Sequence, residues 1–420
     1  MYEPIIVNNI TQKKTGYYFL TLYKINFIEK KLNSLNQQCI LNTLGEIVFF
    51  RKTIFGSDFK IHPNGLISYW HGNGFYLLNK ELEIIDSVSC VNGISTDSHD
   101  FKILPNGHYL LCGKESEIKD LSNVHLYTEK HLPGSKRSIV EYDVIQELDK
   151  NKNLVFEWKT KPYFDIAYIN TVYLTDTAKI DLTHFNSIDA DSKGNILVSF
   201  RRFDELMKID RKTGNIIWRM GGKYNQIKIL NDSIPFLGQH DAQFTGENTI
   251  SLFDNGYSLD SLKHNARGLE YEIDDVNKTA KLIWSYSNKN KIVSIATGSF
   301  KKHKNETALI SYGKTNKEAI NITCEMLNNK SQIIQTISFK DTLGTYRAYF
   351  YTKLPFKLKQ ESIVISKKDS LYLLSTKQKY KYYLWSTGET TAEISVFSIN
   401  KNHVFVSNDG INYTRSQTLK

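Results

Sequence analysis

Short apolar runs joined by turn residues recur along most of the chain. The segment FKIHPNG at residues 59–65 returns as FKILPNG at residues 101–107. Looser copies stand at residues 189–195, 243–248 and 300–305. In each copy an apolar run leads into the turn and a second apolar run follows, and Asn and Gly accept the positive φ angles that tight turns need. The pattern therefore predicts a series of β-hairpins.

A second pair of apolar runs follows these hairpins. It is clear at residues 140–158, 207–218 and 270–284, and weaker at residues 75–85 and 322–335. Each repeat thus has four strands, and a four-stranded unit at a period of about 40–60 residues is typical of a β-propeller blade. The alternative is an unrelated all-β solenoid, which the separated four-strand pattern disfavours.

The chain ends supply the strands that remain. Five repeats run from about residue 52 to 340, which leaves apolar runs at residues 17–21, 38–41, 47–50 and 346–350. A propeller must remove its open sheet edge, and pairing the two chain ends in one blade does so. We therefore predict an all-β fold, with a six-bladed β-propeller over residues 1–352.

The last part of the chain has a different pattern. Short alternating runs between residues 362 and 406, with a turn at Thr387 and Gly388, predict a small β-sandwich over residues 353–420 with Trp385 in its core. The segment YLWSTGETTAEISV resembles the C-terminal immunoglobulin-like modules of Bacteroidetes surface and secreted proteins. This resemblance implies an Ig-like module.

Composition excludes several classes of function. The chain of 420 residues is too long for one ordinary core, and its net charge is +10. The lysines are scattered and the densest patch, KKHK at residues 301–304, is short, so we interpret the excess as a solvated basic face rather than a nucleic-acid site. The four cysteines lack metal-ligand spacing, and no run approaches the roughly 18 apolar residues of a membrane span.

Histidines precede the repeated turns in three of the predicted blades. We interpret His99, His184 and His240 as occupying one repeat position, so that their imidazoles converge on the central channel. Three histidines could hold zinc, but the neighbouring Asn186 and Arg201 disfavour a metal site. A core or turn role for each histidine is the other alternative.

A pair of arginines follows the apolar run at residues 196–200. Strand alternation would place only one of Arg201 and Arg202 on the channel face, and we select Arg201. Three histidines, an arginine and an asparagine suit a compact anion such as sulfate or phosphate, with a neutral imidazole as nucleophile. The sequence has no phosphate-binding glycine loop, which disfavours nucleotide-dependent transfer.

These motifs resemble those of the bacterial arylsulfate sulfotransferases over about residues 17–350. The resemblance is carried by DLTHFNSI with ILVSFR, QHDAQF with LFDNG, and HDFKILPNG, at residues 181–188, 196–201, 239–244, 252–256 and 99–107. It implies a six-bladed propeller whose channel holds the active site. It also implies transfer of a sulfuryl group from an aryl sulfate to a phenol by a ping-pong cycle, through a sulfohistidine and without a nucleotide donor.

The resemblance also assigns roles to individual residues. His240 would be the nucleophile and His184 the general acid and base. Arg201 and His99 would bind the sulfuryl oxygens, with Asn186 as their polar neighbour. No cofactor and no metal are implied.

The implied partners are a small aryl sulfate donor and a phenolic acceptor, with no nucleic acid and no membrane span, and a homodimer is possible. Aryl sulfate chemistry implies a periplasmic or secreted protein. The first residues, MYEPIIVNNITQKK, lack a signal-peptide pattern, so we expect a signal upstream of this chain or, alternatively, a cytoplasmic protein. The other functional hypothesis is a non-catalytic propeller that binds a sulfated or anionic ligand.

Overall fold

The computed structural model describes the backbone of residues 4–8 and, in full, residues 15–24, 36–54, 57–123, 135–166, 178–257, 264–303, 307–315, 322–339, 343–358 and 360–419. Over these residues the regular structure consists of strands and one short 3-10 helix, η3 (Arg201–Phe203). The predicted all-β class is confirmed. No helix in this part of the chain is long and apolar enough to cross a bilayer.

Four consecutive parts of the chain each form an antiparallel sheet in which sequential strands are neighbours. The first sheet consists of β5 (Phe59–Ile61), β6 (Ile67–His71), β7 (Gly74–Leu78) and β8 (Ile84–Val88), and the second of β9 (Ser95–Ile103), β10 (Tyr109–Lys119), β11 (Ser138–Leu148) and β12 (Leu154–Lys159). The third sheet consists of β14 (Phe185–Ala190), β15 (Ile196–Phe200), β16 (Glu205–Ile209) and β17 (Ile216–Gly221). The fourth consists of β19 (His240–Phe244), β20 (Thr249–Asp254), β21 (Arg267–Asp274) and β22 (Thr279–Ser287). Two short strands are added in parallel, β13 (Lys179–Asp181) on β11 and β18 (Lys228–Leu230) on β22.

Two further sheets contain strands from both ends of this region. The first holds β24 (Ser299–Lys302), β25 (Ala308–Ser311), β27 (Ile322–Leu327), β28 (Ile333–Phe339) and the N-terminal β1 (Pro4–Asn8). The second holds β29 (Leu343–Tyr351), β2 (Tyr17–Lys24), β3 (Asn36–Asn42) and β4 (Ile47–Thr53). The small pair β23 (Ser294–Ala296) and β26 (Lys314–Thr315) lies apart from them.

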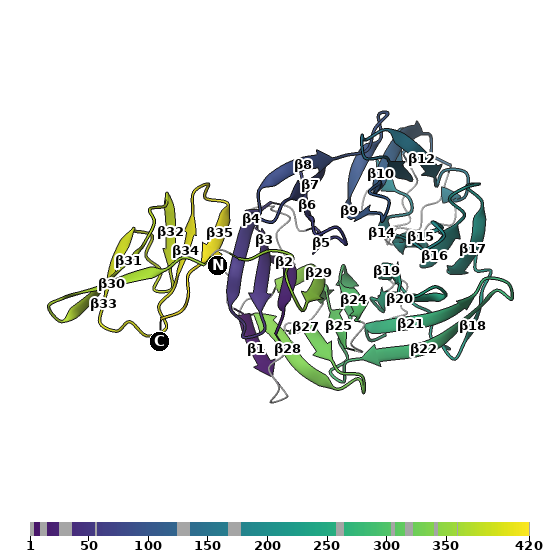
Figure 1. Cartoon of the computed structure of the whole chain (residues 1–420). Helices are drawn as coiled ribbons and strands as arrows, with labels where there is room; N and C mark the ends of the chain where they lie inside the picture. The colour runs from purple at the N-terminus through teal and green to yellow at the C-terminus, as the bar shows by residue number, and fades with distance from the viewer. Residues whose placement is uncertain are drawn as a thin grey trace.

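The sheets follow one another around a ring (Figure 1), with β5, β9, β14, β19, β24 and β29 nearest its centre. The strand β29 pairs antiparallel with β2, so that Tyr17 lies opposite Tyr351. The predicted pairing of early and late strands in one sheet is therefore confirmed, and it leaves no open edge between β2 and β29.

The last strands of the chain continue this closing sheet. The strands β32 (Tyr382–Trp385), β34 (Val404–Ser407) and β35 (Asn412–Arg415) extend it because β35 pairs with β4, and Tyr413 stacks on Phe50 with ring centroids 4.6 Å apart. A second sheet holds β30 (Ile363–Lys368), β31 (Leu371–Thr376) and β33 (Glu393–Val396). Trp385 is buried between these elements. The Ig-like character of this part stays a prediction.

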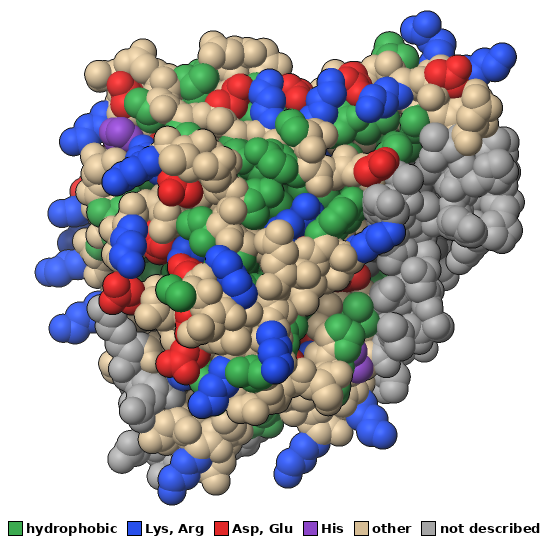
Figure 2. Space-filling view, turned by 90° about the vertical axis from the view of Figure 1, so that its right-hand side faces the viewer, with side chains coloured by type: hydrophobic (Ala, Val, Ile, Leu, Met, Phe, Trp, Pro, Cys, Tyr) green, Lys and Arg blue, Asp and Glu red, His purple; other side chains and the backbone are tan. Residues whose placement is uncertain are grey.

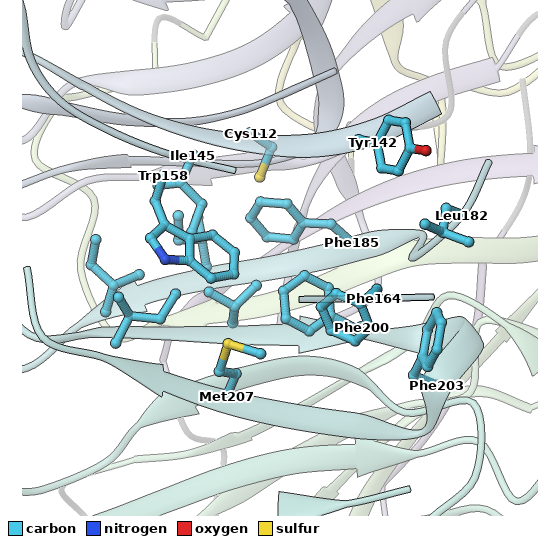
Figure 3. Close-up of a cluster of buried hydrophobic side chains, with 14 of the residues drawn as sticks. Cys112, Tyr142, Ile145, Trp158, Phe164, Leu182, Phe185, Phe200, Phe203 and Met207 are labelled. Carbon is cyan, nitrogen blue, oxygen red and sulfur yellow. The ribbon is translucent and has the colours of Figure 1, made fainter. Parts of the chain in front are cut away.

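Apolar side chains fill the spaces between neighbouring sheets. Figure 3 shows Cys112, Ile145 and Trp158 of one sheet facing Phe185 and other residues of the next. Each large side chain buried in this way contributes about 1.5–3 kcal/mol. Figure 2 shows Lys and Arg mixed with Asp and Glu on one face of the molecule, which agrees with the interpretation of the basic charge as a solvated surface.

Candidate active site

The inner strands and the residues just before them share two equivalent positions that are mostly polar. Five inner strands end in a turn closed by a backbone N–H, that of His62, Leu104, Asp191, Thr245 or His303. Five residues before it lies the histidine layer, which consists of Ser57, His99, Asn186, His240 and Gly298. Four residues before it lies the aspartate layer, which consists of Asp58, Asp100, Ser187, Asp241 and Ser299. The two layers therefore place residues from five parts of the chain near the centre of the ring.

The predicted repeat position of His184 was wrong. His99 and His240 occupy equivalent positions, but the residue equivalent to them in the third sheet is Asn186. The register of β14 against β15 shifts between Phe185 and Ser187, and His184 has φ 51°, in the left-handed region that few residues other than glycine adopt. This bulge lets His184 reach the site from just ahead of the strand.

The structure brings the three predicted histidines together, with His184 against His99, and Tyr346 beside both His99 and His240. The rings of His99 and His184 meet edge to face with centroids 4.8 Å apart. The ring of Tyr346 lies 5.3 Å from His240 and 6.4 Å from His99, and its hydroxyl donates to the carbonyl of His99 at 2.7 Å. Sequence analysis treated Tyr346 only as part of a closing strand. Its position next to Arg347 on that inner strand was the signal that could have identified it.

His240 is held as a neutral imidazole with one defined tautomer. Its side chain is buried, and Nδ1 lies 2.7 Å from the carbonyl oxygen of Gly298. Because a carbonyl only accepts, Nδ1 carries the hydrogen and Nε2 carries the lone pair. Burial lowers the pKa of His240 well below its usual value, and the positive charges of Arg347 and Arg201 lower it further.

The segment before His240 is fixed by hydrogen bonds from neighbouring strands. The Leu237 N–H donates to Asp254 at 3.0 Å, and Asp254 is paired in turn with Arg267. The amide of Asn186 donates to the Gln239 carbonyl at 2.6 Å. The side chain of Gln239 donates to Ser199, Phe200 and Glu205 at 3.0–3.3 Å. The QHDA and FDNG motifs therefore position the histidine.

His99 and His184 each lie against an aspartate that sequence analysis did not identify. His184 Nδ1 donates to Asp181 at 2.6 Å, and His99 Nδ1 to Asp97 at 2.5 Å. Burial lowers the pKa of His184 to about 4, although Asp181 acts in the opposite direction. Both Nδ1 atoms are thus engaged, which leaves Nε2 of each ring for chemistry.

The prediction that strand alternation places Arg201 and Arg202 on opposite faces was wrong. Arg201 and Arg202 lie in η3, where a 3-10 turn replaces the strand and successive residues no longer alternate between two faces. Arg201 is buried and its guanidinium donates to the Ile295 carbonyl. Arg202 donates to the Asp181 carbonyl and lies 3.8 Å from its carboxylate. Arg202 therefore supports the aspartate that holds His184.

Below the histidine layer, a buried ionic network occupies the centre of the ring. The Arg347 guanidinium lies 3.2 Å from Asp58, 3.1 Å from Asp100 and 3.3 Å from Asp241. Lys60 bridges Asp58 and Asp100 at 2.6 Å each. The cations hold the pKa of Asp58 below, and that of Asp100 well below, the usual value, although burial alone would raise it. Arg347 was a further residue that the sequence analysis missed.

The sequence model of the family described as Arylsulfotransferase (ASST) matches residues 8–351. The chain belongs to the arylsulfotransferase family. It is thus an enzyme of a family whose sulfotransferases use no nucleotide sulfate donor. No curated protein matches the chain.

Solved structures give more distant likenesses. A protein of unknown function from Bacteroides caccae is 11% identical, with 81% of this chain and 100% of that chain covered and a TM-score of 0.49. Virginiamycin B lyase from Staphylococcus aureus is 9% identical, with 90% and 96% covered and a TM-score of 0.36. The dihydro-heme d1 dehydrogenase NirN is 11% identical, with 99% and 78% covered and a TM-score of 0.35. The family assignment rests on the sequence match and not on these structures.

The site arrangement suits a tetrahedral anion. A neutral imidazole, two further imidazoles and the buried Arg201 guanidinium converge on one region, and positive charge with N–H donors is the combination that stabilises the oxygens of such an anion. Over the described residues, no group of three His, Cys, Asp or Glu side chains is arranged to hold a metal ion. The individual roles given to His240, His184 and Arg201 stay predictions.

We expect Arg201→Ala to lower kcat/KM for an aryl sulfate about a hundredfold or more, because a buried donor to the transition state is lost. Arg202→Ala should cost about tenfold, since that side chain acts through Asp181. Arg201→Lys should restore activity only in part, because an ammonium lacks the planar fork of donors. Steady-state turnover of phenyl sulfate measures all three, and equal losses for Arg201→Ala and Arg202→Ala would contradict this division of roles.

Arg347→Met should lower the free energy of unfolding by about 3–5 kcal/mol, because it leaves buried carboxylates without their cation. Lys161→Met, which removes an exposed ion pair with Glu117, should cost less than about 1 kcal/mol. Because the folded-state pKa values of Asp58 and Asp100 lie below the unfolded value of about 3.9, their contribution is present above that pH and is lost as the pH falls below it. Urea unfolding between pH 7 and pH 3 tests both points, and equal costs for the two variants would refute the role of Arg347.

Proposed function

We propose that this enzyme transfers the sulfuryl group of an aryl sulfate ester to a phenolic acceptor through a sulfohistidine at His240, in a ping-pong cycle. The observation that carries this proposal is the state of His240. Its Nδ1–H is donated to the Gly298 carbonyl and burial lowers its pKa, so Nε2 offers an unprotonated lone pair. The family match supports the same chemistry.

In the first half of the cycle, His240 Nε2 attacks the sulfur of the aryl sulfate. The N–S bond forms as the bond from sulfur to the aryl oxygen breaks, and the electron pair of that bond leaves with the phenolate oxygen. His184 donates its Nε2 proton to this oxygen. Burial keeps the His184 pKa at about 4 in the free enzyme, and the negative charge of a bound sulfate ester favours the protonated form needed here.

The second half reverses these steps with a new phenol. The phenol gives its proton to the neutral Nε2 of His184 while its oxygen attacks the sulfur of sulfohistidine. The N–S bond breaks and its electron pair returns to His240. One residue thus serves as acid and then as base, which a ping-pong cycle with two chemically similar oxygens requires.

The remaining residues are assigned from their contacts. Arg201 and His99 bind the sulfuryl oxygens, whose negative charge increases as the aryl oxygen leaves. Asn186 donates to the Gln239 carbonyl and receives a hydrogen bond from Arg347 at its own carbonyl at 2.7 Å. We therefore assign Asn186 mainly to positioning the peptide next to His240.

We also propose that the six sheets of four or more strands are the six blades of a closed propeller, with residues 353–420 as an appended module. Hydrogen bonds between adjacent inner strands support this arrangement. The Ile188 N–H donates to Asp100 at 3.2 Å, and the Ala242 N–H donates to Ser187 at 2.9 Å. The pairing of β29 with β2 supports closure of the ring.

Incubation with phenyl sulfate in the absence of a phenol should add one sulfuryl group to the wild-type protein, as measured by intact mass at neutral or higher pH. His240→Ala should abolish this mass gain, because the attacking nitrogen is gone. His71→Ala, which changes an exposed histidine on β6, should retain it. A mass gain that persists in His240→Ala would refute the nucleophile assignment, and binding of phenyl sulfate with no mass gain or turnover would favour a non-catalytic site.

A further inference from the structure

A lysine connects the two aspartates that lie behind His99 and His184. Lys114 Nζ lies 2.9 Å from Asp181 Oδ1 and 3.5 Å from Asp97 Oδ2. The other oxygen of each carboxylate accepts the hydrogen bond from a histidine. The two histidine rings also contact each other, so these five side chains form a closed circuit behind the reacting atoms.

The circuit joins two neighbouring sheets. Asp97 and Lys114 lie on the paired strands β9 and β10, where the register shifts between Leu111 and Gly113. Asp181 ends β13, which pairs with β11 of the same sheet, and His184 follows it just before β14 of the next sheet. Lys114 thus lies where its single charge reaches both histidine–aspartate pairs.

Lys114 opposes the mutual repulsion of the carboxylates around it. A third carboxylate, Asp143 of β11, faces the same region, and Arg202 lies against Asp181 from η3. Burial raises the pKa of Asp143 to about 7, and the charges of Asp181 and Asp97 act in the same direction while Lys114 opposes them. If Lys114 were absent, this buried cluster would take up a proton at a higher pH.

Protonation of Asp97 or Asp181 would change the adjacent imidazole. A protonated carboxyl donates one hydrogen bond from its O–H, whereas the ionised form only accepts. A neutral carboxyl is a weaker acceptor for the Nδ1–H, and an O–H turned toward Nδ1 would need a lone pair there, so the ring could change its tautomer or its orientation. The Nε2 atom that faces the site would no longer be held in the form that the chemistry needs.

We propose that Lys114 is a positioning residue that keeps Asp97 and Asp181 ionised together, and thereby fixes the orientation and tautomer of both His99 and His184. Its catalytic consequence rests on the proposed sulfuryl transfer, but its effect on the histidines does not. Lys114 contacts the carboxylates and acts on the reaction only through them.

The test compares Lys114→Met with Lys114→Arg. The Met variant should lower kcat for phenyl sulfate about a hundredfold with KM changed by less than about threefold, because ground-state binding is retained. The acid limb of its profile of kcat/KM against pH should move up by about one unit or more, since the cluster then holds a proton at higher pH. The Arg variant keeps the charge and should keep the acid limb of the wild type. Lys119→Met, on the same strand and paired with Glu117 at the surface, should change neither quantity.

A second readout separates this proposal from the proposed function. Nitrogen-15 spectra of the histidines should show Nδ1–H forms for His99 and His184 in the wild type, a change at one or both in Lys114→Met, and no change at His240. This result would support the role of Lys114 even if phenyl sulfate gave no turnover. Lys114→Gln replaces the Met variant if the latter does not fold. Unchanged histidine spectra in the charge-removing variant, or a loss in Lys114→Arg as large as in Lys114→Met, would overturn the proposal.

Discussion

The interaction on which the rest of the structure depends is that of Arg347 with three buried carboxylates. Asp58, Asp100 and Asp241 come from the inner strands of three different sheets, and their oxygens lie 3.1–3.3 Å from the one guanidinium. Arg347 is on β29, which pairs with the early strand β2, so the strand that joins the two ends of the ring also supplies this guanidinium. Closure of the ring and neutralisation of its centre are therefore linked.

This network also sets the positions of the reacting histidines. His99 directly precedes Asp100, and His240 directly precedes Asp241, so holding the two aspartates holds the backbone of the two histidines. Burying charge is costly, so a buried ion pair is by itself weak evidence for net stability, and in some proteins its role is to specify one conformation. Here we interpret that specificity as the fixed geometry of the histidine layer.

Sequence patterns predicted the parts of the fold that follow regular rules. Alternating apolar runs and Asn-Gly turns predicted the four-stranded sheets. The apolar runs that remained outside the repeats predicted the pairing of the two chain ends. The motifs around His99, His184 and His240 identified side chains that the structure does bring together.

The failures have more than one physical cause. His184 lies beside a bulge and Arg201 begins a 3-10 turn, and neither irregularity alters the apolar pattern from which register is inferred. Asp97 and Asp181 lie only two and three residues before the histidines that they hold, and this short spacing was the signal that could have identified them. Lys114 was missed because its contacts with both aspartates join residues far apart in sequence. The pairing of β35 with β4 was missed for the same reason, since nothing local in either strand specifies its partner.

The central claim is that the sulfuryl group passes through the protein. Rapid mixing of the enzyme with a chromogenic aryl sulfate, without any phenolic acceptor, tests it most directly. The account predicts a burst of released phenol equal in amount to the enzyme, followed by a slow phase that speeds up when a phenol acceptor is added. Release of phenol only when the acceptor is present from the start would contradict it, because that result requires direct transfer between the two bound molecules.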